Sequence, residues 1–431
     1  MKVNKFLAIF LSCMFVFSAC DKTTPDNEKN DNTQGDNEEI VDGDDNDNTP
    51  SETLGGYASS GGVMILNQGI RSECSTLTYV APDGTVEENV YSMVNGTKFG
   101  HAAQDMYMYN GKFYILSDNC DKYNTLGDGS LVVADAVTLK KEKAFKYEDF
   151  KFLKPEGSLQ KEDSLYMVMP MTNIVVVDEK NVFLSDQKAL YRFDSTTGEL
   201  YIVEGSYHFG NQGVTIESVA STRGMTVIDD YVYCGGGGFW ETTRLLEFCK
   251  DKDIATRKLV DLDGDFISGI CRTGEREIML ATCGRKGSTK SYLYFVDIDK
   301  WEIVKKKTIP VDISAEFFNN SGVALSGDYL YFAAGTLNIS RMSVKNWKVD
   351  KNFIDVKKDV PSAEYLNCNI VADSKTQYIY VAVSETYGED VVSKGNVLVY
   401  DCSKDTPVLI QNIENKTSYP VGIYPISNFN R

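Results

Sequence analysis

KFYILSDN, residues 112–119, is a run of β-branched and aromatic residues that ends in small and polar ones. The turn residues Asn110 and Gly111 come directly before it, which is typical of the second strand of a hairpin. Six further segments share this pattern at a spacing of about fifty residues, with one longer gap, and so indicate a repeat architecture. They are VMILNQG (63–69), NVFLSDQ (181–187), YVYCGGG (231–237), EIMLATCG (277–284), YLYFAAG (329–335) and YIYVAVSE (378–385).

Each copy is flanked by further strands. Another strand precedes most of the turns, as in GMTVIDD (224–230), and a third strand follows each copy, as in LYFVDI (293–298). A charged fourth strand comes next, as in EIVKKKTI (302–309), where lysines discourage pairing between exposed sheet edges. Four strands in each of seven units predict an all-β fold, a seven-bladed β-propeller with four-stranded blades.

The two ends of the repeat region predict that the ring closes. Only GGYASSGG (55–62) precedes the first copy, whereas a spare strand, YPVGIYPIS (419–427), follows the last one. We expect this C-terminal strand to complete the first blade, because closure removes exposed edges. An open β-solenoid or two sandwiches are the alternatives, and neither needs the spare strand. Residues 148–171 do not fit the repeat and predict an insertion between the second and third blades, whose role stays open.

The first residues have the pattern of a lipoprotein signal. Lys2 and Lys5 precede an apolar run, residues 6–17, which is too short to span a bilayer. Ser18 and Ala19 then lead directly into Cys20, which resembles the bacterial lipobox. The pattern predicts a signal peptide at residues 1–19 and a lipidated Cys20. A plain secretory signal with an incidental cysteine is the alternative.

Residues 20–52 predict the lipidated cysteine and a disordered acidic tether. Twelve acidic residues and two lysines lie between Asp21 and Glu52, with hardly any apolar side chains. Such a segment cannot bury enough surface to offset the entropy of ordering. The tether and the two signal lysines account for a net charge of minus eight, so the propeller region, residues 53–431, carries minus ten of the total of −18. It has no basic block, which disfavours nucleic acid and anionic lipid as partners.

Residues 63–119 carry VMILNQG, LTYVAPDG, NGTKFGHAAQD and NGKFYILSDN in this order. This series resembles the opening of the YncE-like, or BtuG-like, propeller surface lipoproteins of the Bacteroidetes, and the resemblance extends over most of residues 60–427. It implies a seven-bladed propeller that is lipid-anchored to the outer membrane. The acidic residues after Cys20 also look like the surface-export signal of that phylum, which implies that the domain faces the cell exterior.

The resemblance implies a non-enzymatic capture protein without a cofactor. Relatives of this kind capture corrinoids and pass them to a TonB-dependent transporter, so we expect a corrinoid or a similar nutrient chelate as ligand and a monomeric protein. A protein- or glycan-binding module is the alternative. A metal-dependent enzyme is disfavoured, because His101 and His208 are the only histidines.

Propeller ligands usually bind on the face built by the loops after the second strands and by the connections between blades. Aromatic residues and arginine supply binding energy at a low cost in ordering. GFWETTR (238–244) is the first candidate loop, although Phe239 and Trp240 could instead pack between blades. The expected ligand-binding residues, with no catalytic or metal-ligating residue among them, are Arg71, Tyr123, His208, Phe239, Trp240, Arg244, Arg285, Phe317, Tyr365 and Tyr387.

The eight cysteines beyond Cys20 form no C-x-x-C pattern, which disfavours zinc. Cys271 and Cys368 fall in inner strands and are expected to be buried thiols. Two pairs occupy equivalent positions in adjacent blades and could form disulfides in an exported protein: Cys74 with Cys120, and Cys234 with Cys283. The glycine run at residues 235–238 predicts close backbone packing or ligand approach.

Overall fold

The computed structural model describes residues 54–429 except 70–72, 119–126, 168–170, 187, 211–212, 214, 219–223, 239–240, 285–286, 314–321, 335 and 387–393. The predicted signal peptide, the lipidated Cys20 and the acidic tether lie outside the described residues. Among the residues that are described, no helix is both long and apolar enough to cross a membrane.

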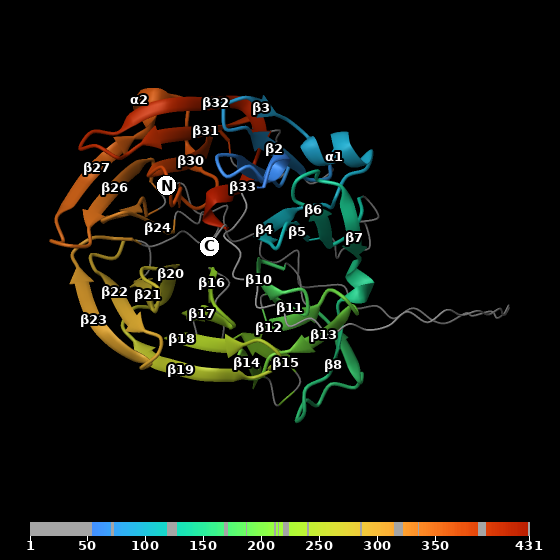
Figure 1. Cartoon of the computed structure of the whole chain (residues 1–431). Helices are drawn as coiled ribbons and strands as arrows, with labels where there is room; N and C mark the ends of the chain where they lie inside the picture. Colours follow the sequence, from blue (N-terminus) through green and yellow to red (C-terminus); the bar gives the residue numbers. More distant parts are fainter. Residues whose placement is uncertain are drawn as a thin grey trace, which may run out of the picture. The chain divides into compact units, whose positions relative to one another are not determined.

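Seven antiparallel blades form a closed ring (Figure 1). The second blade contains β4 (Ala103–Tyr109), β5 (Lys112–Ser117), β6 (Leu131–Asp135) and β7 (Lys141–Phe145), and the third contains β10 (Asn173–Asp178), β11 (Asn181–Ser185), β12 (Leu190–Asp194) and β13 (Glu199–Ile202). The fourth contains β16 (Met225–Ile228), β17 (Tyr231–Gly238), β18 (Glu241–Cys249) and β19 (Ala255–Leu262). The fifth contains β20 (Phe266–Arg272), β21 (Glu277–Cys283), β22 (Ser291–Asp297) and β23 (Glu302–Ile309).

The sixth blade contains β24 (Val323–Ser326), β25 (Tyr329–Phe332), β26 (Asn338–Ser343) and β27 (Val349–Asp355). In the seventh, the innermost position is shared by β28 (Tyr365–Leu366) and β29 (Val371–Ala372), followed outward by β30 (Tyr378–Ser384), β31 (Lys394–Asp401) and β32 (Val408–Ser418). The seven sequence copies form the second strand of each blade, so the predicted repeat is confirmed.

The first blade joins the two ends of the domain. The C-terminal strand β33 (Pro420–Pro425) is its innermost strand and pairs with β1 (Val63–Asn67), with Val63 opposite Pro425 and Leu66 opposite Gly422. The strands β2 (Thr76–Val80) and β3 (Val86–Glu87) complete the blade. The predicted closure is therefore confirmed.

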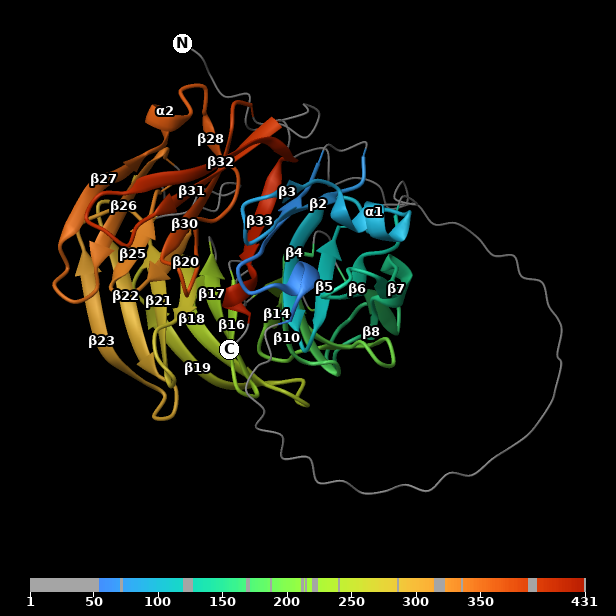
Figure 2. The ribbon, with the colours of Figure 1, turned by 45° about the horizontal axis from the view of Figure 1, so that its top comes forward.

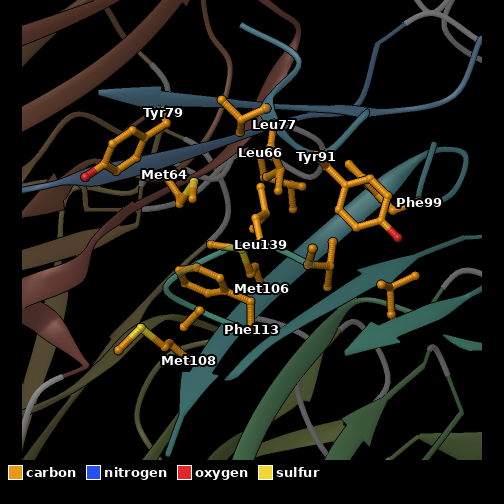
Figure 3. Packing of buried hydrophobic residues seen from close by; sticks show 14 of the residues in the cluster. Met64, Leu66, Leu77, Tyr79, Tyr91, Phe99, Met106, Met108, Phe113 and Leu139 are labelled. Atoms are coloured by element: carbon orange, nitrogen blue, oxygen red, sulfur yellow. The ribbon is translucent and has the colours of Figure 1, made fainter. Parts of the chain in front are cut away.

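The hydrophobic core lies between neighbouring blades rather than at one centre. Figure 3 shows one such layer, in which Met64 and Leu66 of β1 face Met106 of β4 and Phe113 of β5. All four side chains are buried. Because each blade buries its two faces only against its neighbours, every blade depends on the ring being complete.

Residues 148–171 form a hairpin outside the blades, made of β8 (Lys151–Leu153) and β9 (Ser164–Tyr166). Phe150 and Phe152 are buried against Phe193 and Tyr191 of the third blade, with ring centroids 5.1 Å apart in both pairs. This packing places β8 beside β13, the outer strand of that blade (Figure 1). The insertion therefore covers an edge.

Every outer edge of the ring is protected in some way. The pairing of the outermost strand with its neighbour is shifted in register in five blades, the second and the fourth to seventh. In the third blade the pairing of the outermost strand β13 is regular, but β8 covers this strand. In the first blade the outermost strand β3 has only two residues. Bulges, covers and short strands are the devices that keep sheet edges from pairing with other chains.

The antiparallel order gives the ring two different faces. We call loop face the end that carries the connections between blades and the loops from second to third strands: 68–75, 118–130, 186–189, 284–290, 333–337 and 385–393. The turn face carries the short turns from first to second and from third to fourth strands. Both ends of the described domain lie there, since Tyr57 N donates to Val137 O at 3.0 Å and Ile426 N to Gly62 O at 3.0 Å.

Ion pairs between blades connect the turn face. Lys112 Nζ of the second blade lies 2.7 Å from Glu179 Oε1 of the third. Arg192 of the third blade pairs with Asp253 beside the fourth, and Arg276 of the fifth pairs with Asp229 of the fourth. These contacts add to the cohesion of neighbouring blades on the turn face.

The cysteines only partly follow expectation. Cys368 is a buried thiol, as predicted, but Cys271 is half-buried because it lies near the turn-face end of β20, where flanking residues are also accessible. Cys234 and Cys283 are both thiols, so the disulfide considered between them is not formed. Cys74 is likewise a thiol, and Cys120 lies outside the described residues.

Candidate ligand-binding face

Three of the ten residues expected to bind a ligand are described by the structure: His208, Arg244 and Tyr365. The other seven lie outside the described residues, and their prediction stays open: Arg71, Tyr123, Phe239, Trp240, Arg285, Phe317 and Tyr387.

Tyr365 is at the innermost position of the seventh blade. It follows the short helix α2 (Val356–Asp359) and pairs with Ser384 of β30, at the loop-face end of that strand. Tyr365 is 39% exposed, whereas its neighbour Leu366 is buried. An accessible aromatic ring at the inner end of a blade is suitable for contact with a ligand on the axis.

Arg244 lies on β18, opposite Gly236 of β17. Its Nε donates to Thr242 O at 3.0 Å, and the preceding Thr243 is buried and donates to Gly264 O at 2.6 Å. The half-buried guanidinium is thus held at the loop-face end of the fourth blade. At Gly235 the expected close packing is confirmed, because a Cβ there would lie 2.8 Å from Ile267 Cγ1 of the fifth blade.

His208 lies on a hairpin that the sequence pattern did not indicate, formed by β14 (Tyr207–Gly210) and β15 (Thr215–Ser218). The histidine is exposed, and Figure 1 shows both strands at the periphery of the ring. Leu159 N of the insertion donates to Gly213 O at 2.9 Å, which joins the two hairpins. The structure therefore does not bring His208 together with Tyr365, which is on the far side of the ring.

A half-buried carboxylate connects segments of the loop face between the first and second blades. Asp128 accepts hydrogen bonds from Tyr91 Oη at 2.6 Å and Thr97 Oγ1 at 2.8 Å, and pairs with Lys141 Nζ at 2.8 Å. Tyr91 belongs to α1 (Val90–Asn95), in the connection between these blades. Burial opposes ionisation, but the hydrogen bonds from Lys141, Tyr91 and Thr97 outweigh it and hold the pKa of Asp128 below its ordinary value.

We expect Asp128→Asn to lower the free energy of unfolding by about 1–2 kcal/mol at neutral pH, because it weakens a charge-assisted network. A lowered folded-state pKa stabilises the protein above the unfolded-state pKa, and this contribution disappears as pH falls through the folded-state value. The difference from the wild type should therefore shrink between neutral pH and about pH 3. Urea unfolding at both pH values measures it.

The exposed Asp163, whose side chain is 95% accessible and pairs with Lys154, provides the control. Asp163→Asn should change stability by less than about 0.5 kcal/mol at either pH. An Asp128→Asn effect that stays constant with pH would show that the carboxylate charge is not what stabilises this network.

Sequence reasoning missed an acid on the ring axis. Asp105 of β4 accepts a hydrogen bond from Tyr424 Oη of β33 at 2.8 Å and from Ile174 N of β10 at 3.0 Å. It thus connects the innermost strands of three blades, which Figure 1 shows together near the axis. Met106 N donates to both Asp105 Oδ1, at 2.8 Å, and Tyr424 Oη, at 3.1 Å.

Asp105 and Tyr424 are both half-buried, and each keeps some accessible surface. Burial raises the pKa of Asp105. Gly422 makes room for this arrangement, since a Cβ there would collide with the Tyr424 ring. The available signal was an aspartate within the apolar strand AQDMYMY, residues 103–109.

Other acids near the loop face are also held by internal donors. Asp186 Oδ1 accepts from Lys188 N at 2.6 Å and Ala189 N at 2.8 Å, while Tyr191 Oη donates to Asp186 Oδ2 at 3.0 Å. Within the described ranges, no group of three or more His, Cys, Asp or Glu side chains is arranged to hold a metal ion. In the described part of this face, the acids are therefore held by internal hydrogen bonds, and a few aromatic and cationic groups are accessible to a ligand.

A family model described as Domain of unknown function (DUF5074) matches residues 61–424. The chain belongs to the DUF5074 family. The match begins just before β1 and ends in β33, so it spans the whole closed ring of this DUF5074 protein. No curated protein matches the chain.

Two solved structures are similar to this DUF5074 protein at low identity. A Bacteroides fragilis protein described as a candidate 6-phosphogluconolactonase is 11% identical, with a TM-score of 0.51 over 84% of this chain and 97% of that chain. The computationally designed Ika8 protein is also 11% identical, with a TM-score of 0.38 over 76% of this chain and 91% of that chain. The likeness to the Bacteroides fragilis protein shows a shared fold and carries no activity with it.

Proposed function

We propose that this DUF5074 propeller is a non-enzymatic capture protein of the cell surface, anchored to the outer membrane through a lipidated Cys20. It binds a bulky nutrient chelate, such as a corrinoid, on its loop face and passes it to a TonB-dependent transporter. The observation that carries the proposal is the difference between the faces. The turn face is crossed by ion pairs between blades and holds both ends of the domain, whereas the accessible Tyr365 and the half-buried Arg244 lie at the loop face.

A closed ring suits capture for a physical reason. Binding a ligand costs less when the groups that contact it are already ordered, and seven blades packed on one another fix the bases of all the loops. Asp105 and Asp128 add polar contacts that tie loop-face segments of neighbouring blades together. A large, flat ligand can then contact several blades at once.

The test is calorimetric titration of the full chain with cobalamin, cobinamide and two ferric siderophores. We expect saturable heat with one of them and a loss of affinity of tenfold or more, about 1.4 kcal/mol, in Tyr365→Ala and in Arg244→Ala. Tyr166→Ala is the matched control, because Tyr166 is a similarly exposed tyrosine, at 43%, on the insertion. No heat with any ligand, or an equal loss in the control, would exclude chelate binding at this face.

One observation favours a second candidate, a propeller that binds a macromolecule. The insertion exposes Leu153 at 77%, Leu159 at 67% and Tyr166 at 43%. Exposed apolar side chains of this kind are typical of protein contacts. If all four chelates fail to bind, this surface becomes the first place to look for a protein or glycan partner.

A further inference from the structure

Two tryptophans occupy equivalent turns in neighbouring blades. Trp301 precedes β23 in the fifth blade and Trp347 precedes β27 in the sixth, both with positive φ, at 56° and 65°. Each ring packs against the preceding blade: Trp301 against its second strand, β17, and Trp347 against its third strand, β22. Trp301 lies 6.3 Å from Tyr233 and Trp347 lies 6.2 Å from Phe295, measured between ring centroids. The two junctions can therefore be compared position by position.

At the first junction, the cation over the tryptophan is neutralised from within. The Arg257 guanidinium carbon lies 4.8 Å from the centroid of Trp301. Arg257 Nε donates to Glu247 Oε1 at 2.8 Å, and Nη2 also contacts Glu247, whose side chain is 1% exposed. Glu247 is opposite Arg257 in the pairing of β18 with β19. At this junction the cation therefore contacts both an indole and a carboxylate that neutralises its charge.

At the second junction, the carboxylate is replaced by an aromatic ring. Lys305 is opposite Phe295 in the pairing of β22 with β23, so Phe295 holds the position that Glu247 holds one blade earlier. Two ammonium groups now lie over one indole, Lys305 Nζ at 4.3 Å and Lys307 Nζ at 5.3 Å from the centroid of Trp347. The lysine between them faces the other way, where it pairs with Asp263.

Among the described residues, no carboxylate compensates the charge at this junction. Within the described strands and turns, neither Lys305 nor Lys307 forms an ion pair with a carboxylate, although other lysines nearby do, such as Lys300 with Asp297. Cation–π attraction stabilises each ammonium at an accessible site by only about 0.5–1 kcal/mol and does not cancel the repulsion between them. An anion between the two ammonium groups would supply what Glu247 supplies at the first junction.

We propose that Lys305, Lys307 and Trp347 form a phosphate-binding site on the outer edge of the ring, between the fifth and sixth blades. Figures 1 and 2 show β23 and β27 on neighbouring blades at this rim. Two ammonium groups match the charge and the acceptor oxygens of a dianionic phosphate. The site is separate from the loop face and does not depend on the proposed capture function. The phosphate could belong to a soluble monoester or to a lipid headgroup, and the acidic domain favours the small soluble anion.

The test follows Trp347 fluorescence in the full chain as inorganic phosphate is added at constant ionic strength, with chloride as the reference anion. The signal is the difference between the wild type and Trp347→Phe. We expect a saturable change that is weakened at least tenfold in the double variant Lys305→Gln/Lys307→Gln. The double variant Lys300→Gln/Lys348→Gln is the control, since both of those lysines have acidic partners. A response equal to that of chloride, or one unchanged in the first double variant, would overturn the proposal.

A second arm distinguishes the source of the phosphate. The protein is floated with vesicles of phosphatidylcholine alone or with added phosphatidylglycerol. Flotation only with the anionic vesicles, lost in Lys305→Gln/Lys307→Gln and competed by inorganic phosphate, supports a lipid headgroup. Absence of flotation together with a phosphate response supports a soluble monoester. Three of the four lysines are exposed and Lys307 is half-buried, so the variants are expected to fold, and their melting temperatures verify this.

Discussion

A chain that ends at Ser418 is expected to lose cooperative unfolding. The truncation removes β33, so β1 loses its inner neighbour and the buried Val63 and Ile65 become accessible. The truncation also removes the buried Ile423 and Ile426, and truncating even one such side chain typically costs about 2–5 kcal/mol. The combined loss is comparable to the whole stability of a domain, about 5–15 kcal/mol. Thermal melting followed by circular dichroism, with the soluble yield, measures the effect.

A chain that ends at Phe429 is the control, since it keeps β33 and should melt like the full protein. The result that would refute the closure argument is a Ser418-terminated chain that stays soluble and melts cooperatively within a few degrees of the control. In that case the first blade would be stable with three strands, and the ring would not depend on its last strand.

The second large effect is expected from Asp105→Ala, which should lower the free energy of unfolding by about 2–4 kcal/mol. The change leaves Ile174 N and Tyr424 Oη without their acceptor, and both lie on the innermost strands of other blades. Urea denaturation of the full chain gives the value. A double-mutant cycle with Tyr424→Phe should give a coupling of about 1 kcal/mol, because the two groups share one hydrogen bond.

An exposed aspartate and the pH dependence serve as controls for the Asp105 variant. Asp405→Ala removes a fully exposed carboxylate and should cost little. The pH dependence has a definite sign, because burial raises the pKa of Asp105 and the folded state therefore favours the protonated acid. The stability difference between wild type and Asp105→Ala should grow as pH falls through that raised pKa towards the ordinary aspartate range. A difference that shrinks over this window would contradict the assignment.

The blade architecture was accessible from the sequence because its signals are local and repeated. Hairpin turns such as Asn110–Gly111 precede the second strand in six of the seven blades, and the buried second strand itself occurs in all seven, so a failure of one copy does not hide the pattern. The closing strand was identified by counting strands, since the first copy had no strand before it and one strand was left over after the last copy. Register within each blade then follows from the turns.

The site was less accessible, for reasons that particular residues illustrate. His208 is at the periphery because two four-residue strands form a hairpin within a connection, and strands that short give no clear periodicity. Asp105 meets Tyr424 across a sequence separation of 319 residues, which no local pattern reports. The Lys305–Trp347 junction was hidden for another reason. Lysines on an outer strand fit a protective role, and only the comparison with Glu247 and Trp301 shows that a counter-charge is missing.

The protected outer edges of the blades affect how closely copies of this molecule can be crowded together without aggregating. Growth of a fibre needs a straight, continuous edge whose unpaired amides accept the next chain. This ring offers a shifted, covered or two-residue edge at each blade, so collisions between neighbouring rings do not template one another. Rings crowded together in a layer therefore stay separate molecules and do not join into fibres.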